Sequence, residues 1–109
     1  MDATFRDELL EMHLALGLPC SCGCGRPLTR PEVHHGIVTK ARARGVKGNW
    51  IDHKYNCFLV NHDCHQRIPG PQHFWEVACE RWGRENVQEW YDGVQGLFKS
   101  ELEGYDRTD

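Results

Sequence analysis

Two neighbouring histidines, His34 and His35, are the residues of this sequence best suited to chemistry. The residues around them, EVHHGIV, include the β-branched types that are typical of a short strand. Side chains alternate across a strand, so one imidazole can bind a metal ion while the other reaches a different atom. A second histidine-bearing segment, NHDCH, ends at His65, nine positions after Asn56. A metal ion held between two such distant segments would also close the fold.

This pattern of histidines suits the hydrolysis of a phosphate ester. Imidazole titrates near neutral pH and so accepts a proton from an attacking water. A divalent cation neutralises the charge that develops on the phosphate and on the leaving oxygen. Imidazole ligands suit Mn, Co, Ni or Zn somewhat better than Mg, so the sequence leaves the identity of the cation open.

Six cysteines are many for a chain of 109 residues. The first residues lack the basic and apolar pattern of a secretory signal, which predicts a reducing compartment such as the cytoplasm. In such a compartment cysteines bind metal more often than they form disulfides. A chain of this length also buries little apolar surface and gains from a metal staple. We therefore expect a metal centre among the cysteines.

The elements that must position these residues fit one α+β domain over residues 1–109. The spacing of apolar residues predicts an N-terminal helix within residues 1–19. Gly and Pro among the next three cysteines predict a tight turn, which leads into the strand with the histidine pair; CFLV predicts a second strand that runs into a helix. The pattern after Pro71 predicts C-terminal helices over residues 71–103, broken near Gly83, whose tryptophans we expect to serve the core.

Charge is distributed unevenly along the chain, although the net charge is only -3. Residues 20–54 carry seven Lys and Arg side chains against two acidic ones, and both ends of the chain are acidic. A local basic region of this kind is typical of a partner rich in phosphate. Four basic residues lie in the loop between the histidine pair and Asn56: Lys40, Arg42, Arg44 and Lys47. We expect them to bind a nucleic-acid backbone without reading its sequence. No apolar run is long enough to span a membrane, so we expect no membrane partner.

Residues 20–68 resemble the HNH endonuclease family, through the motifs EVHH and YNCFLVNHDCH and the CxCxC turn that precedes them. The resemblance implies a ββα-metal core of strand, loop, strand and helix. It implies that His34 and the helix-borne His65 bind a catalytic divalent cation. It further implies that His35 is the general base, which Asn56 orients by holding the loop. The implied substrate is DNA, cut on one strand or on both, by an enzyme like those of phages and mobile elements.

Many members of this family also carry a structural zinc, bound by one CxxC before the histidine pair and a second that ends just before the last histidine. This chain departs from that pattern in its CxCxC spacing and in Asn61, which stands where the third cysteine would be. The resemblance implies zinc ligands drawn from Cys20, Cys22, Cys24, His62 and Cys64. We prefer the last three together with one of the first two. Cys57 is an alternative ligand, although its apolar strand favours burial, and Cys79 is expected in the core.

The sequence also allows two functions without catalysis. A zinc-knuckle protein holds nucleic acid without cutting it and does not need the geometry of the histidine pair and the asparagine. A structural protein uses its Cys and His residues in two closed zinc sites. We expect His13 to be packed or solvated. We expect His53 to be a surface histidine with no task, the alternative being a contact with phosphate or assistance to the base. His73 opens a helix and is a lesser candidate for a ligand of the catalytic cation.

Overall fold

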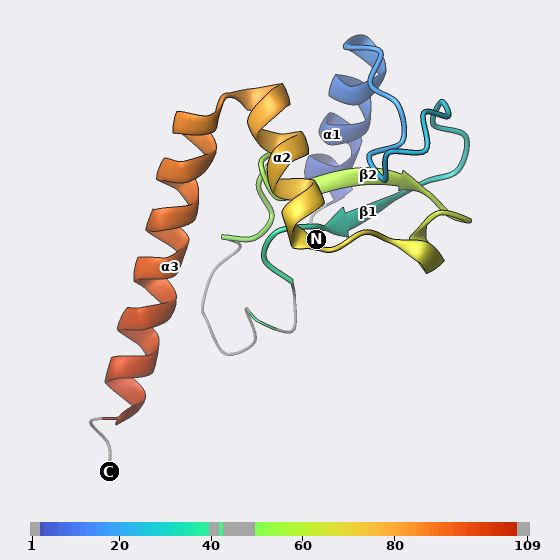
Figure 1. Cartoon of the computed structure of the whole chain (residues 1–109). Helices are drawn as coiled ribbons and strands as arrows, with labels where there is room; N and C mark the ends of the chain where they lie inside the picture. The colour runs from blue at the N-terminus through green and yellow to red at the C-terminus, as the bar shows by residue number, and fades with distance from the viewer. Residues whose placement is uncertain (1–2, 40–41, 43–49, 107–109) are drawn as a thin grey trace.

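The computed structural model describes residues 3–39, 42 and 50–106, with side chains up to residue 97. Its elements, in chain order, are helix α1 (Ala3–Ala15), strands β1 (Pro31–His35) and β2 (Cys57–Asn61), the 3-10 turn η1 (His65–Arg67), and helices α2 (Pro71–Trp82) and α3 (Arg84–Asp106). The strands form one two-stranded sheet beside α1 and α2, and α3 extends away from the far end of α2 (Figure 1). This mixture of helices around an antiparallel sheet confirms the α+β class.

The hairpin places the two neighbouring histidines on opposite faces of the sheet. β1 and β2 run antiparallel, with His34 opposite Phe58 and His35 opposite Cys57. His34 lies against Phe74 of α2, with ring centroids 5.0 Å apart. His35 shares the face of Cys57, which belongs to the apolar cluster under α1. The two imidazoles therefore lie in different surroundings, as the alternation of side chains along a strand predicts.

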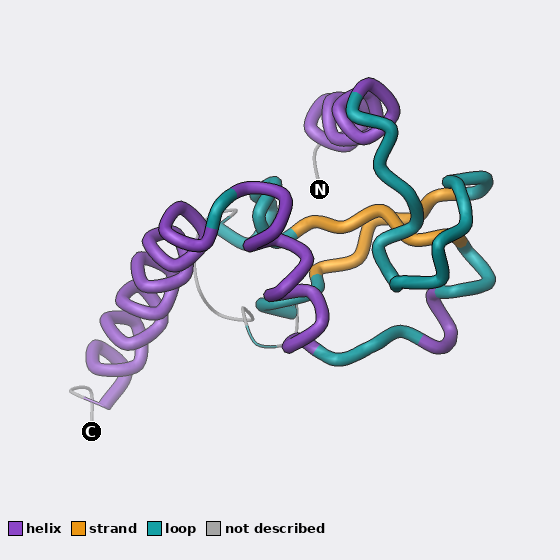
Figure 2. The backbone as a smooth tube through the Cα atoms, turned by 45° about the horizontal axis from the view of Figure 1, so that its top comes forward, coloured by secondary structure: helices purple, strands orange, loops and turns teal. Residues whose placement is uncertain are grey.

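Helix α1 covers one face of the sheet, and α2 lies on the other side (Figure 2). Leu9 of α1 is buried against Cys57 and Leu59 of β2. The helix ends before Gly17, whose φ of 65° lies in the left-handed region that favours glycine at the end of a helix. The N-terminal helix that the sequence predicts is therefore present, and its role is to cover the sheet.

Helix α2 covers the second face with the larger apolar cluster. Phe74 and Ala78 of α2 are fully buried, and they belong to the same cluster as Phe58 and Val60 of β2. Phe58 and Phe74 meet directly, with ring centroids 4.8 Å apart. Aromatic pairs at this distance contribute beyond the area that they bury. This packing fixes α2 against the strand opposite His34.

The break between the C-terminal helices lies at Gly83, as the sequence predicts. Its φ of 92° lies in the region that favours glycine, and its N–H donates to the carbonyl of Cys79 at 3.0 Å. Beyond it, α3 turns the buried side chains of Val87 and Val94 toward the core. Three tryptophans pack around this junction, partly buried: Trp75, Trp82 and Trp90.

The segment after β2 differs from the ββα arrangement that the resemblance implies. His65 begins the short 3-10 turn η1 rather than an α-helix. Ile68, with φ -77° and ψ 138°, is extended because the ring of Pro69 disfavours the helical conformation in the residue before it. The α-helix begins only at Pro71, a position where proline is well tolerated. The expectation that His65 lies on the helix is therefore wrong.

Within the described parts of the chain, no helix has both the length and the apolar character that crossing a bilayer requires.

The close approach of Gly36 to α2 predicts a large effect of a single methyl group. A Cβ on Gly36 would lie 2.7 Å from Cβ of Phe74 and 2.8 Å from Cδ2 of Phe58. Because this contact is tighter than real side chains allow, we expect Gly36→Ala to lower the free energy of unfolding by about 1–3 kcal/mol in urea denaturation. Gly93→Ala on α3 is the control, since nothing lies within 4 Å of its added Cβ. Equal stability of Gly36→Ala and wild type would contradict this packing.

The buried His13 predicts a loss of stability in mild acid. Burial lowers the pKa of His13 despite the opposing hydrogen bond to the Leu9 carbonyl, and the charge of Arg81 lowers it slightly further. Its Nε2 has no hydrogen-bond partner among the described residues. The unfolded chain, with a histidine pKa of about 6.5, therefore binds the proton more readily than the folded chain. Unfolding free energy should fall as the pH drops below about 6.5, until His13 is protonated in both states. In His13→Leu the loss between pH 7.5 and 5 should be smaller; an unchanged loss would contradict this.

Candidate metal centre and active site

His34, His35 and His65 line one pocket beside β1. Its volume is about 640 Å³, and it runs from α1 along the strand to η1. The full lining is Arg6, Asp7, Leu10, Pro31, Glu32, Val33, His34, His35, Thr39, Leu59 and His65. The structure therefore brings together at one pocket the three histidines that the sequence singled out, although His65 comes from a turn.

The rings of His34 and His65 lie at a separation that two ligands of one cation have. Their centroids are 5.3 Å apart, with an interplanar angle of 76°. A cation about 2.1 Å from one nitrogen of each ring lies roughly 3.2 Å from each ring centre, so two adjacent ligands have centroids roughly 4.6–5.3 Å apart. The separation of the two ring centres therefore lies at the upper end of the range for two ligands of one cation.

The surroundings of His34 favour the neutral imidazole that binds metal. Burial lowers the pKa of His34, and the nearby His65 and His35 lower it further. Metal ions compete with protons for the imidazole nitrogen, so a lowered pKa leaves more of the ligand form at neutral pH. On its other side the ring contacts Phe74, which restricts its motion.

His35 forms a dyad with Asp52. The imidazole Nε2–H donates to Oδ1 of Asp52 at 2.7 Å, and both side chains are largely buried. The thiol of Cys57 lies close to both side chains, and the spacing of these three groups would also allow a metal ion to bind between them. Two atoms bound to one zinc lie roughly 3.3–3.6 Å apart in a tetrahedral site, so the 2.7 Å separation is that of a direct hydrogen bond. Asp52 thus holds His35 in one orientation, and Nδ1 keeps the lone pair.

The fully buried Asn56 ties the loop between the strands to β1. Its Oδ1 accepts hydrogen bonds from the backbone N–H groups of Ile37 and Val38, at 2.9 and 2.8 Å. Its Nδ2 donates to the carbonyls of Val38 and Ile51, both at 2.9 Å. Because Ile51 precedes Asp52, the same amide that fixes the end of β1 also fixes the residue that holds His35.

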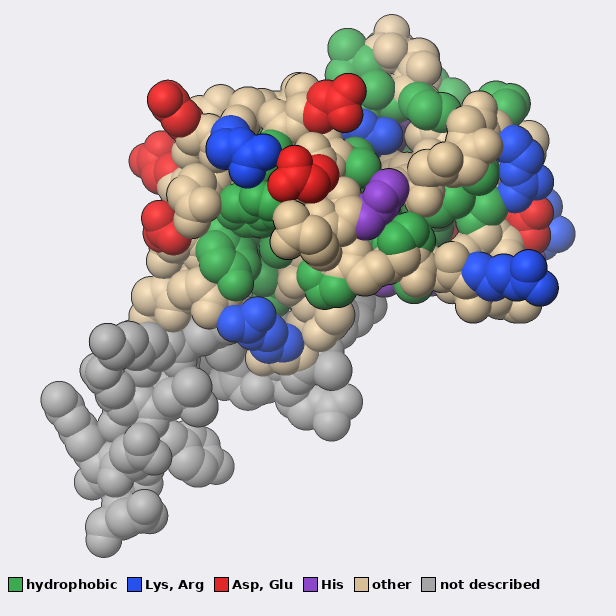
Figure 3. All heavy atoms as spheres, in the orientation of Figure 1, with side chains coloured by type: hydrophobic (Ala, Val, Ile, Leu, Met, Phe, Trp, Pro, Cys, Tyr) green, Lys and Arg blue, Asp and Glu red, His purple; other side chains and the backbone are tan. Residues whose placement is uncertain are grey.

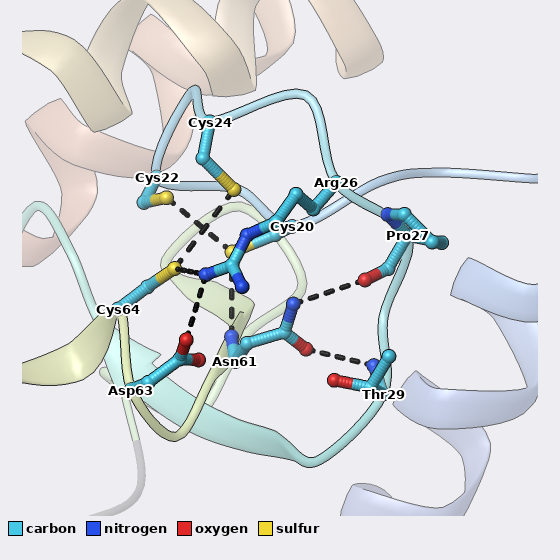
Figure 4. A network of polar contacts seen from close by, with 9 residues as sticks. All are labelled: Cys20, Cys22, Cys24, Arg26, Pro27, Thr29, Asn61, Asp63 and Cys64. Carbon is cyan, nitrogen blue, oxygen red and sulfur yellow. Dashed lines mark hydrogen bonds and ion pairs between the residues drawn. The ribbon is translucent and has the colours of Figure 1, made fainter.

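Four cysteines from two segments of the chain form a second possible metal site (Figure 4). They are Cys20, Cys22, Cys24 and Cys64. Their sulfur atoms all lie within 4.8 Å of one another, and all four thiols are free. The Sγ atoms of Cys20 and Cys22 are 3.4 Å apart, and those of Cys24 and Cys64 are 3.8 Å apart. Sulfur atoms around one zinc ion lie roughly 3.8 Å apart. The cluster therefore fits a structural metal such as zinc.

Arg26 supplies positive charge to this cluster. Its Nη2 lies 2.8 Å from Sγ of Cys64 and 2.9 Å from Oδ2 of Asp63. The backbone N–H of Arg26, and then its guanidinium, lower the pKa of Cys24 to about 6. The thiolate is the form of cysteine that binds metal. The site therefore carries one cysteine already suited to be a ligand at neutral pH.

The structure corrects the zinc ligand set that the sequence favoured. Cys20 and Cys22 both belong to the cluster, and His62 does not, since its Nδ1 lies 3.0 Å from Oε2 of Glu32. Asn61 lies beneath the cluster, where its N–H donates to Sγ of Cys20 at 3.3 Å. Its side chain also joins the turn, through bonds to Thr29 N and Pro27 O. The CxCxC spacing thus delivers three ligands from one turn, which leaves one to come from Cys64.

The remaining cysteines and histidines are packed in the interior or hold the turn. Cys57 and Cys79 are buried, as the sequence predicts. His53 is partly buried between aromatic side chains rather than at the surface, with its ring centroid 5.8 Å from that of Trp90. His73 does not line the pocket of the three histidines, and its Nε2–H donates to the carbonyl of Ser21 at 2.8 Å. Helix α2 therefore braces the cysteine turn.

Two carboxylates of the site were missed by the sequence reasoning. Asp52 holds His35, and Glu32 accepts hydrogen bonds from the Nδ1 atoms of both His62 and His65. These bonds, that of His62 first, lower the pKa of Glu32 and keep it ionised at neutral pH. The only hint in the sequence was an acid two residues before the histidine pair and another four residues before Asn56.

The expected nucleic-acid contacts fall mostly outside the described residues. Lys40, Arg44 and Lys47 lie there, and only Arg42 is described. Its Nη2 donates to Oε1 of Gln95 on α3 at 2.8 Å, so the Arg42 side chain is tied to that helix. Figure 3 shows Lys and Arg side chains interspersed with acidic ones on the face in view, rather than a single basic stripe.

Comparison with known proteins gives no relative: no family model matches the chain, and neither a curated protein nor a solved structure is similar to it.

The cysteine cluster predicts how metal content and stability respond to substitution. We expect one tightly held zinc per chain by native mass spectrometry, and its loss in Cys24→Ala. Structural zinc contributes ~10 kcal/mol or more to folding, so this variant should lose its cooperative melting transition. Cys79→Ala, outside the cluster, should keep the metal, and so should His62→Ala. A Cys24→Ala protein with full zinc content and unchanged melting would contradict the assignment.

Proposed function

We propose that this protein is a metal-dependent endonuclease of the HNH type, which hydrolyses phosphodiester bonds of DNA. The observation that carries the proposal is the 5.3 Å separation of the His34 and His65 rings, in a pocket that His35 also lines. Two protein ligands leave a cation with open positions for phosphate and water. A pocket of about 640 Å³ beside the partly buried strand β1 has room for a phosphodiester group.

Each histidine has a separate task in this proposal. His34 and His65 bind the cation through neutral ring nitrogens. A divalent cation bound there stabilises the charge of the phosphate and of the leaving oxygen. His35 takes the proton from the attacking water at Nδ1, because its Nε2–H is already donated to Asp52. As His35 gains this proton, the carboxylate of Asp52 stabilises the resulting imidazolium.

Asn56 and the cysteine cluster serve the proposed enzyme by fixing its geometry. Asn56 joins the end of β1 to the segment that carries Asp52, through bonds to Ile37, Val38 and Ile51. The cysteine cluster, with zinc bound, would hold the turn before β1 to the segment that follows β2. That second segment also carries His65, so a structural zinc at Cys64 would help to keep His65 beside His34.

The alternative function is a zinc-knuckle module that binds nucleic acid without cutting it. The cysteine cluster and the basic loop would suffice for that function. Binding alone does not need the His35–Asp52 dyad, which takes a histidine and a carboxylate largely out of water. This dyad favours the enzyme, and the loss of cleavage without loss of binding distinguishes the two functions.

Cleavage of supercoiled plasmid in the presence of Mn²⁺ tests the proposed roles. General base catalysis contributes typically 10²–10⁴-fold, so His35→Ala should lower the nicking rate by about that factor. Asp52→Asn should reduce the rate by a smaller factor, because it weakens the orientation of His35 and leaves its ring in place. Both variants should still bind DNA in a gel-shift assay.

Asp92→Asn is the matched control for Asp52→Asn, since Asp92 lies exposed on α3 and bonds only to Gln88 in the described contacts. It should cleave at the wild-type rate. Equal nicking by wild type and His35→Ala would remove His35 as the base. DNA binding by wild type with no cleavage under Mn²⁺, Mg²⁺, Co²⁺ or Ni²⁺ would favour the binding module.

A further inference from the structure

The carboxylate of Glu32 joins two histidines that the cysteine cluster does not use. Its Oε1 accepts a hydrogen bond from Nδ1 of His65, and its Oε2 accepts one from Nδ1 of His62, both at 3.0 Å. Glu32 lies two residues before His34 on β1, so its side chain leaves the strand on the same face as that of His34. His65 therefore contacts two residues of β1. Its Nδ1 bonds to the carboxylate of Glu32, and its ring packs edge-on against that of His34.

The chemistry of these bonds determines which nitrogen of His65 is free. An ionised carboxylate only accepts hydrogen bonds, so each imidazole must carry its proton on Nδ1. A neutral ring with its proton on Nδ1 has its lone pair on Nε2. Histidines that bind metal commonly donate their other ring N–H to a carboxylate in this way, and this bond fixes both tautomer and orientation.

Strand pairing and backbone hydrogen bonds position Glu32 next to His62 and His65. Glu32 is paired with Val60, and the N–H of His62 donates to the carbonyl of Arg30 at 2.9 Å. The N–H of His65 in turn donates to the carbonyl of His62 at 3.3 Å. The strand register thus places both imidazoles over the carboxylate. The side chains of Glu32, His62 and His65 are 40, 51 and 36% exposed, so the contact adds little to stability and its main effect is on orientation.

We propose that Glu32 is the positioning residue of this site: it accepts N–H bonds from Nδ1 of His62 and His65 and so reserves Nε2 of His65 for the cation. The inference rests on the proposed function for the identity of that ligand. The proposal also assigns a role to His62, whose hydrogen bond holds the carboxylate of Glu32 in place.

The tautomers of the histidines test this proposal without any cleavage. Long-range ¹⁵N–¹H spectra of the labelled protein, treated with a mild chelator that spares the cysteine centre, report which ring nitrogen carries the proton. In the wild type, His65, assigned with a His65→Gln variant, should be protonated on Nδ1. In Glu32→Ala the acceptor is gone, and we expect the Nδ1–H form of His65 to be lost in favour of a mixture or of the Nε2–H form.

Binding of Mn²⁺, measured by calorimetry on the same proteins, gives the second readout. Loss of an outer partner of a metal ligand typically lowers affinity about 10–100-fold, so we expect the Kd of Glu32→Ala to rise by that factor. His62→Gln, which keeps the bond between Glu32 and His65, should change the Kd less. Glu76→Gln is the matched control, because Glu76 forms a similarly exposed pair with Arg84 on the α2–α3 side and should have no effect.

The outcomes separate this proposal from the proposed function. A His65 tautomer and a Kd that are the same in Glu32→Ala and wild type would overturn the role of Glu32, even if the protein cleaves DNA. If the tautomer of His65 depends on Glu32 but the wild-type protein binds no Mn²⁺, the result would support the positioning role of Glu32 and contradict the proposed function. Melting temperatures within a few degrees of wild type would show that Glu32→Ala is folded.

Discussion

The arrangement of the site depends on the four hydrogen bonds of one buried amide, that of Asn56. This side chain is fully buried, and all of its donors and acceptors are used by the backbone at the end of β1 and by Ile51. Removing any of these partners would leave a buried polar group unpaired, which costs about 1–3 kcal/mol. The amide therefore fixes the distance between β1 and the loop, and with it the contact between His35 and Asp52.

The small core explains why other interactions must complete the fold. The apolar residues form two separate clusters, one under α1 and one under α2, on opposite faces of a sheet of only two strands. The larger cluster includes Cys20, and Cys22 and Cys64 pack against it. The cysteine turn is also held by polar contacts from Asn61, His73 and Arg81. A metal at the four cysteines would connect the turn to the segment after β2. The same segment carries His65, so in the proposed enzyme a metal at the cysteines would couple folding to the position of His65.

Local pattern was enough to predict both strands, the flanking helices and the cysteines of the cluster, but not the 3-10 turn that begins at His65. The two strands, the helix break at Gly83 and the cysteine ligand types follow from spacing, from glycine and from the redox argument. The two carboxylates could not be predicted, because they meet their histidines only through the strand register and the folded loop. His62 was misassigned since its position before Cys64 resembles that of a ligand, and only the fold shows that its ring turns to Glu32.

The central claim is that His34 and His65 share one divalent cation beside the His35–Asp52 dyad. Anomalous diffraction from crystals grown with Mn²⁺ tests it most directly. The account predicts a Mn²⁺ peak within about 2.3 Å of one ring nitrogen of each histidine, with no direct contact to His35. A peak at other residues, or a pair of rings that turn away from each other in the crystal with Mn²⁺ present, would contradict it.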